Sequence, residues 1–118
     1  MLNIKIETNC KDYNKANAQT KKVLDKAMDK LARLIIDLDS SGVKFEKIFN
    51  NDVIKYDILG KNFYTFKFRA EDKTQLRALY RFNRVDDGQA EIELHKFFIK
   101  RNPDKSYIKV FESYVNDF

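Results

Sequence analysis

The chain has 118 residues, of which 43% are hydrophobic and 14% aromatic, and glycine and proline are rare. This length suits one domain with its own core, and the composition excludes a disordered or low-complexity chain, so we expect a single domain over residues 1–118. The net charge of +5 favours an anionic partner, either nucleic acid, anionic lipid or an acidic protein.

The chain contains one cysteine, Cys10, and one histidine, His95. These two residues cannot form a disulfide or a zinc ligand set, and no glycine-rich phosphate loop is present, so we expect a reducing compartment, no metal and no cofactor. The N-terminus lacks the layout of a signal peptide, and no apolar run approaches the roughly 18 residues that cross a membrane. We therefore expect a cytoplasmic protein that does not enter membranes.

The first half of the chain predicts a strand followed by helices. Apolar residues alternate with polar ones over residues 2–6, as in a strand with one buried face. From about 14 to 39 they recur at spacings of three and four, which predicts one long amphipathic helix or two in sequence. The small residues at 40–42 can end this helix. Residues 43–58 remain ambiguous, with one helical turn near 45–49 and an extended piece near 53–58.

The second half predicts three strands and a final helix. The strands are expected at 63–69, 75–82 and 90–101, and Asp86, Asp87 and Gly88 supply hairpin chemistry between the last two. Asp104 can cap a helix. The expected apolar stripe of this helix consists of Ile108, Phe111, Val115 and Phe118. The order β-α-α-β-β-β-α predicts an α+β fold, in which N-terminal helices pack on one face of a small, twisted, antiparallel-rich sheet.

Alternation along these strands places many basic side chains on one sheet face. The expected core face consists of Tyr64, Phe66, Phe68, Leu76, Ala78, Tyr80, Phe82, Ile92 and Leu94. The opposite face is expected to carry Lys67, Arg69, Arg77, Arg81, His95, Phe97, Ile99 and Arg101. Lys100 has the opposite parity from Arg101, and a bulge near Phe97 and Phe98 would move Arg101 to the other face. A solvated face rich in Lys and Arg is the ordinary alternative to a binding groove.

Helical phase places Tyr107 at the rim of the final helix, in its first turn, and Ile108 in the core. Tyr114 falls on the same shoulder as Tyr107. A tyrosine in this position ordinarily packs its ring and leaves its hydroxyl to water. Because Tyr107 closely follows Lys100 and Arg101 in the chain, it is also a candidate for a functional site.

Two segments carry a resemblance to a known family, FKFRAEDKTQLRALYRF and IELHKFFIKRNPDKSY. They resemble the RelE and HigB toxins of bacterial toxin-antitoxin systems, including phage-borne HigB-type proteins. The matching features are a strand ending in Lys67-Phe68-Arg69, a strand with Arg77-Ala78-Leu79-Tyr80, a last strand ending in Lys100-Arg101, and Tyr107 beyond it. The resemblance covers mainly residues 59–110, and it implies a RelE-like fold.

The resemblance also implies an endoribonuclease that cleaves mRNA on the ribosome without metal, by attack of a ribose 2′-hydroxyl on the adjacent phosphate. Its partners would be mRNA, the ribosome and a cognate antitoxin protein. The implied catalytic residues are Arg69 and Arg101, which would stabilise the phosphorane, and Tyr107, which would stack on a base or transfer a proton. The implied RNA-binding residues are Lys67, Arg77, Arg81, His95 and Lys100.

Two other functions are compatible with the same residues. The ParE toxins resemble this architecture and act on DNA gyrase, so a phage or plasmid protein of this fold can act by binding gyrase without nuclease activity. A basic module that binds RNA or an acidic protein, with no chemistry, is the other alternative. Steep salt dependence with no cleaved product would indicate such a module.

Overall fold

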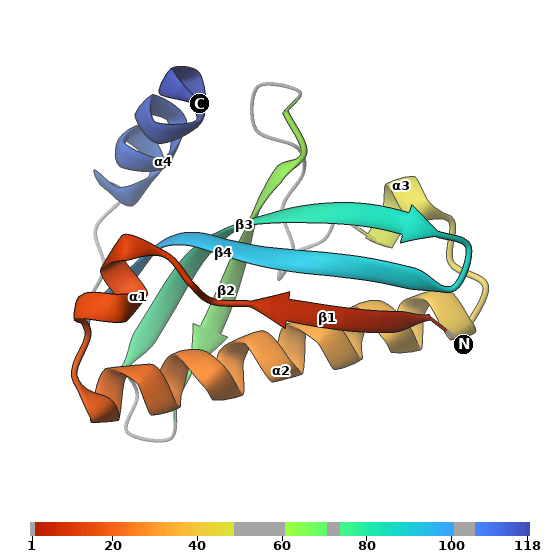
Figure 1. Ribbon diagram of the computed structural model, residues 1–118, viewed down its shortest axis with the longest axis horizontal. Helices are drawn as coiled ribbons and strands as arrows, with labels where there is room; N and C mark the ends of the chain where they lie inside the picture. Colours follow the sequence, from red (N-terminus) through yellow and green to blue (C-terminus); the bar gives the residue numbers. More distant parts are fainter. Residues whose placement is uncertain (1, 49–60, 71–73, 101–105) are drawn as a thin grey trace.

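The computed structural model describes residues 2–48, 61–70, 74–100 and 106–118. It shows an α+β fold with a four-stranded mixed sheet. The elements in chain order are β1 (Asn3–Glu7), α1 (Lys11–Lys15), α2 (Ala18–Ser40), α3 (Phe45–Ile48), β2 (Phe63–Arg69), β3 (Gln75–Asp86), β4 (Gln89–Lys100) and α4 (Ser106–Asp117). The strand order is β1-β4-β3-β2, in which β1 runs parallel to β4 and the other neighbours are antiparallel. Figure 1 shows α2 along one face of this sheet and α4 on the other side.

One long helix, α2, fills most of the region from about 14 to 39 where the apolar pattern predicted one helix or two, and the short helix α1 precedes it. Helix α2 begins after Asn17. The Asn17 side chain accepts a hydrogen bond of 2.8 Å from the backbone N–H of Thr20 and so caps α2. At the other end Gly42 has φ of 79°, a left-handed conformation that glycine adopts without steric cost. The predicted helix stop at residues 40–42 is confirmed.

The main core lies between α2 and the sheet. Every residue predicted on the core face packs in this cluster, with Phe68 only partly buried. From α2 the cluster receives Leu24, Ala27, Met28, Leu31, Ala32 and Ile35, all at most 5% exposed. The apolar residues spaced three and four apart in α2 therefore pack against the apolar residues that alternate along the strands. The predicted packing of N-terminal helices on one face of the sheet is confirmed for α2.

A β-bulge at His95 changes the parity of β4. Leu79 pairs with Lys96 and Tyr80 pairs with Leu94, so His95 is the extra residue between them. Beyond the bulge Phe97 and Ile99 pack against the main core, whereas Phe98 joins residues on the other face. The prediction that Phe97 and Ile99 point away from the core is therefore wrong. Arg101, which alternation predicts on the same face as Phe97 and Ile99, lies outside the described residues.

A second, smaller core joins α4 to the other side of the sheet, which we call the α4 face. Its buried residues are Phe63 and Leu79 from the sheet, and Phe111 and Val115 from the helix. Phe98, Tyr107 and Tyr114 pack against them. Ile108 is 41% exposed, so its predicted place in the core is wrong, and Phe118, at 56%, is also exposed.

Lys61 fastens the C-terminal end of α4. Its ammonium nitrogen donates hydrogen bonds to the carbonyl oxygens of Val115 and Asn116, at 3.0 and 3.4 Å. A cation at this end satisfies carbonyls that have no partner within the helix and interacts favourably with the helix dipole. None of the described helices is both long enough and apolar enough to cross a membrane.

Replacing Tyr80 with phenylalanine is expected to raise the free energy of unfolding by about 1 kcal/mol. Tyr80 is 0% exposed, and its hydroxyl has no hydrogen-bond partner among the described residues. Burial also raises the pKa of Tyr80 well above its usual value, which reflects the same loss of hydration. Urea unfolding monitored by circular dichroism measures the change. Tyr13→Phe is the matched control, because it removes a hydroxyl that donates to Asp25, and it should not stabilise the protein.

Candidate functional site

The α4 face carries polar residues at both ends of the second core. Strand pairing places Lys67 opposite Arg77 at one end, and Phe63 opposite Arg81 and Arg81 opposite Glu93 at the other. Helix α4 runs from the first of these ends to the second, because Tyr107 contacts Arg77 and Phe118 contacts Arg81. The helix therefore covers the middle of the predicted basic face and separates its two ends.

The first end, which we call the basic end, consists of Lys67, Arg69, Gln75 and Arg77 together with Tyr107. Its four sheet residues, with Phe68, line a shallow hollow of about 240 Å³. Lys67 and Arg69 are exposed, and Arg77 is half-buried. In the backbone register, Gln75 also pairs with Lys100, whose side chain lies outside the described part. These cations can neutralise a phosphate that enters the hollow.

Arg77 and Tyr107 form the most specific contact of the basic end. The guanidinium carbon lies 5.6 Å from the centre of the tyrosine ring, in a cation-π arrangement. Arg77 also donates hydrogen bonds to Gln75 Oε1 at 3.1 Å and to the carbonyl oxygen of Leu76 at 3.3 Å, while its buried Nε has no partner among the described residues. These contacts hold the guanidinium in a defined orientation beside an aromatic ring.

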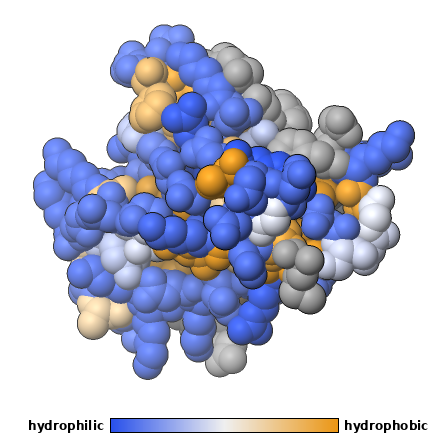
Figure 2. All heavy atoms as spheres, turned by 45° about the vertical axis from the view of Figure 1, so that its right-hand side comes forward, coloured by the Kyte–Doolittle hydropathy of each residue, from blue (hydrophilic) through white to orange (hydrophobic). Residues whose placement is uncertain are grey.

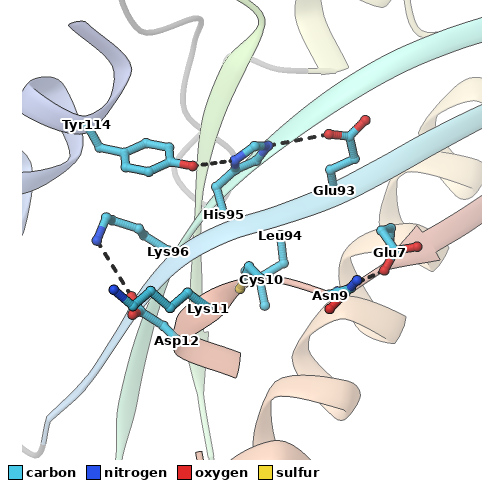
Figure 3. Close-up of a pocket in the computed structure, with 10 residues that line it drawn as sticks. All are labelled: Glu7, Asn9, Cys10, Lys11, Asp12, Glu93, Leu94, His95, Lys96 and Tyr114. Atoms are coloured by element: carbon cyan, nitrogen blue, oxygen red, sulfur yellow. Dashed lines mark hydrogen bonds and ion pairs between the residues drawn. The ribbon is translucent and has the colours of Figure 1, made fainter. Parts of the chain in front are cut away.

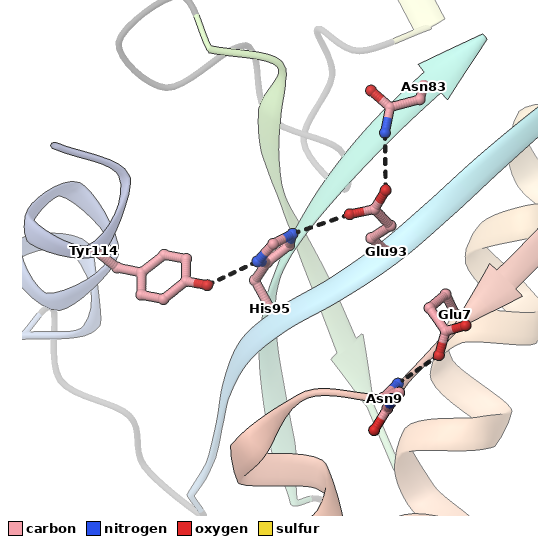
Figure 4. Close-up of polar contacts among 6 residues, drawn as sticks. All are labelled: Glu7, Asn9, Asn83, Glu93, His95 and Tyr114. Atoms are coloured by element: carbon pink, nitrogen blue, oxygen red, sulfur yellow. Dashed lines mark hydrogen bonds and ion pairs between the residues drawn. The ribbon is translucent and has the colours of Figure 1, made fainter. Parts of the chain in front are cut away.

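The second end, which we call the histidine end, consists of Glu93, His95 and Tyr114 (Figure 4) together with Lys96 (Figure 3). The Nδ1 atom of His95 lies 2.7 Å from the Tyr114 hydroxyl oxygen, and its Nε2 atom lies 3.4 Å from Glu93 Oε2, an ion-pair distance outside good hydrogen-bond geometry. Glu93 accepts a hydrogen bond of 3.0 Å from the Asn83 amide. The result is a polar chain that links β3, β4 and α4.

Burial determines the protonation of the histidine end. It lowers the pKa of His95, an effect that the Glu93 carboxylate opposes and that the charge of Arg81 reinforces. Burial likewise raises the pKa of Tyr114, and the nearby Cys10 and Asp12 add to this shift. Both the imidazole and the phenol are therefore neutral near pH 7.

A cleft of about 350 Å³ opens beside this chain of contacts, between the β1-α1 region and β4 (Figure 3). Its wall includes Glu93, His95, Lys96 and Tyr114, and, from the N-terminal region, Asp12. The Lys96 ammonium nitrogen lies 3.7 Å from Asp12 Oδ2 and 5.3 Å from the centre of the Tyr114 ring. The phenol of Tyr114 thus meets the cleft beside a cation.

The structure brings some of the predicted site residues together and separates others. Lys67, Arg69, Arg77 and Tyr107 share the basic end, whereas Arg81 and His95 lie beyond the second core. The Arg81 guanidinium is held between rings, 5.7 Å from Phe63 and 5.3 Å from Phe118. Arg101 lies outside the described residues.

Glu93 and Tyr114 were not predicted as functional residues. Two sequence signals pointed toward them: Glu93 precedes the only histidine by two positions on a strand, and Tyr114 follows Tyr107 by seven positions on a helix. These spacings place Glu93 and His95 on one strand face and both tyrosines on one helix face. The contact between the strand and the helix follows only from the way α4 docks.

Lowering the pH below about 6.5 should destabilise the protein through His95. Burial depresses the pKa of His95 in the folded chain, so the unfolded chain binds the additional proton first. This stabilising contribution is complete above the unfolded pKa and is lost as the pH falls through the folded pKa. Unfolding free energies of the wild type and His95→Gln between pH 8 and 5 measure it, because their difference removes the shared titration of carboxylates. A difference that stays constant with pH would contradict this prediction.

The fold and the site together define a small α+β protein with a basic, tyrosine-flanked surface on one face of a mixed sheet. Comparison of the chain with protein-family models, with characterised proteins and with solved structures gives no significant match. Functional inference therefore depends on the chemistry of the two ends of the α4 face.

Proposed function

We propose that this protein is the toxin of a toxin-antitoxin system, a ribosome-associated endoribonuclease that cleaves mRNA without metal. The observation that carries the proposal is that Lys67, Arg69 and Arg77 line one hollow on the α4 face, and that Arg77 also lies over the Tyr107 ring. The resemblance of the same residues to the RelE and HigB motifs supports it independently of the geometry. The net charge of +5 also favours an anionic substrate.

The residues of the basic end suit a nucleotide. Arginine stays charged at any physiological pH and donates parallel hydrogen bonds that match a phosphate, so Arg69 and Arg77 are suited to hold the RNA backbone. The ring of Tyr107 provides a surface on which an unpaired base can stack, as in many proteins that bind single strands. One nucleotide can thus be recognised through its charge and its base at once.

Surface character also favours a charged partner. In the view of Figure 2, hydrophilic residues dominate the surface, with small groups of apolar residues between them. Four large apolar side chains are exposed among the described residues, namely Val85, Ile108, Val110 and Phe118.

On the proposed function, Arg69 and Arg101 stabilise the phosphorane, Lys100 contributes to RNA binding, and a separate antitoxin protein covers the basic end.

The test is cleavage of a ribosome-bound message. Induced expression should arrest growth and fragment mRNA, and purified protein added to ribosomes stalled on a defined message should produce fragments with 5′-hydroxyl ends. EDTA at a concentration that preserves pre-formed complexes should not stop the cleavage. Intact message together with DNA damage signalling would instead indicate gyrase as the target. Intact message without DNA damage signalling would exclude both mRNA cleavage and action on gyrase.

Binding without chemistry is the second candidate, and one observation favours it. The contacts of Tyr107 are made by its ring, which packs against the second core and lies beside the Arg77 guanidinium, an arrangement that suits stacking on a base. RNA binding that depends on the arginines, in a protein that never cleaves RNA, would support this candidate. Salt dependence would then report the number of phosphate contacts.

A further inference from the structure

The histidine end contains the chain's only histidine, in contact with a tyrosine that borders a cleft. We infer that Glu93, His95 and Tyr114 form a proton relay, in which the Tyr114 hydroxyl exchanges a proton with the ribose 2′-hydroxyl of the RNA. This inference rests on the proposed function and revises one point of it. The cleaved bond lies beside Tyr114, where Lys96 and Lys109 instead of the arginines of the basic end stabilise the phosphorane, and the basic end holds an adjoining part of the strand.

The geometry has the form of an activated hydroxyl. In such arrangements a hydroxyl contacts a base within about 2.6–3.2 Å, and a third group orients the base. Here the hydroxyl is that of Tyr114, at 2.7 Å from His95 Nδ1, and the third group is Glu93, at 3.4 Å from Nε2. Asn83 fixes Glu93 in turn through a hydrogen bond of 3.0 Å (Figure 4).

The surroundings of His95 fix the direction of proton transfer. A carboxylate beside Nε2 favours the tautomer with hydrogen on Nε2, which leaves Nδ1 to accept from the tyrosine hydroxyl. The rings of Phe63 and Phe118 lie edge-on to the imidazole, at 4.9 and 5.4 Å between ring centres. Since Nε2 is buried, a ligand reaches the relay through Tyr114.

Titratable groups from the sheet, from the α1 side and from α4 surround this relay, and those of α4 are Lys109 and Asp117, which line the hollow beside Tyr114. Glu93 and Arg81 act from the sheet, and they shift the pKa of His95 in opposite directions. From the α1 side, Asp12 and Cys10 act on Tyr114 and raise its pKa. Lys96 lies beside the Tyr114 ring and is paired with Asp12. A neutral imidazole next to a neutral phenol is the state from which the relay can accept a proton.

Substrate can reach Tyr114 from two sides. Tyr114 and Lys96 line both the cleft of Figure 3 and an adjoining open hollow of about 430 Å³, in which Lys109 and Ser113 also lie. Lys96 and Lys109 offer cations for a phosphate beside the phenol. Tyr107 and Tyr114 lie seven residues apart on the same face of α4, a rise of about 10 Å, so neighbouring nucleotides of one strand can reach both.

The step balances without a further reactant. The 2′-hydroxyl proton passes to Tyr114 Oη while the phenolic proton passes to His95 Nδ1, and the resulting imidazolium is paired with the Glu93 carboxylate. The 2′-oxygen forms a bond to phosphorus as the bond from phosphorus to the 5′-oxygen breaks. The proton then returns through Tyr114 to the 5′-oxygen, which leaves a 2′,3′-cyclic phosphate and a 5′-hydroxyl.

Replacing Tyr114 with phenylalanine tests the relay on ribosome-bound message. The variant retains the ring packing but loses the hydroxyl, so cleavage should fall by at least about 100-fold, while the Kd for a labelled single-stranded RNA should stay within about twofold. Tyr13→Phe is the matched control, because it removes a hydroxyl that bonds to Asp25 away from the cleft, and it should cleave at the wild-type rate. Wild-type cleavage by Tyr114→Phe would overturn the relay.

A second variant separates proton transfer from a role in fastening α4. In the wild type the cleavage rate should rise with pH as His95 loses its proton. Because the Glu93 carboxylate raises the pKa of His95, Glu93→Gln should move this rise to lower pH, which a merely structural contact would not do. An unmoved pH profile would overturn the relay, even if Tyr114→Phe proved unable to fold.

Failure of the relay and failure of the proposed function give different results. If the wild type cleaves and both variants cleave with its rate and pH profile, the relay is wrong and the nuclease stands. If the wild type leaves the message intact at every pH, the nuclease and the relay both fail.

Discussion

Replacing Phe111 with alanine should lower the free energy of unfolding by about 3–5 kcal/mol. Phe111 is 1% exposed and contacts the rings of Phe98 and Tyr107, each at 5.7 Å between ring centres. Only four residues of the second core are fully buried among those described, so the remaining side chains cannot fill the cavity that the ring leaves. Chemical denaturation, combined with hydrogen exchange of the α4 amides, measures the loss.

Ile108→Ala is the matched control for this prediction. Ile108 lies three residues earlier on the same helix and is 41% exposed, so its truncation should change the unfolding free energy by less than about 0.5 kcal/mol. A cost for Ile108→Ala that equals the cost for Phe111→Ala would mean that α4 packs through a different face. Faster exchange of the α4 amides in Phe111→Ala, with unchanged exchange in the sheet, would show that the helix opens separately.

Removing the three cations of the basic end, by the triple substitution Lys67→Ala, Arg69→Ala and Arg77→Ala, should weaken the binding of single-stranded RNA by at least about 100-fold. Each cation that contacts a phosphate releases counterions, so the slope of log affinity against log salt should become shallower by about 0.7 for each lost contact. Arg77 also lies over the Tyr107 ring, so its replacement removes the cation-π contact as well as a charge. Fluorescence anisotropy over a series of salt concentrations measures both quantities.

A charge-matched triple variant makes this result specific. Lys22, Lys26 and Arg33 are exposed on α2, which lies on the opposite side of the sheet (Figure 1), and their replacement by alanine removes the same three charges. This variant should bind RNA with nearly wild-type affinity. Equal losses in the two triple variants would show that affinity follows the net charge, and the basic end would then have no specific role.

The main core could be predicted from the sequence because it depends on local periodicity. Strands β2 and β3 alternate regularly, so the face that holds Phe66 and Tyr80 followed from the pattern alone, and both residues are fully buried. The helix stop at Gly42 was equally local, since it depends on a left-handed conformation that glycine adopts readily. Features of this kind need no knowledge of the neighbouring elements.

The bulge at His95 could not be predicted in the same way. Adjacent Phe97 and Phe98 showed that alternation breaks in this region, but the position of the extra residue depends on how β4 pairs with β3. The prediction of which face of α4 is buried was wrong for a related reason. Hydropathy favoured Ile108 for the core, whereas the face that α4 covers contains Arg77 and His95, against which a tyrosine packs better because it has both a ring and a hydroxyl.

The two ends of the α4 face illustrate the same limit for function. Alternation correctly gathered Lys67 and Arg77 on one face, because they are cross-strand neighbours. It could not show that α4 covers the middle of that face, nor that Tyr114 would meet His95 across a separation of 19 residues. Long-range docking therefore determines which predicted residues can act together.

The parallel pairing of β1 with β4 has a consequence for how the chain folds. Asn3 pairs with Gln89 and Glu7 with Glu93, so β1 needs a partner that is synthesised 86 residues later. Contacts so distant in sequence slow folding, because a large loop must close before they form. The β3-β4 hairpin is local and can form first. The sheet is therefore complete only after translation of β4, when β1 can pair with it.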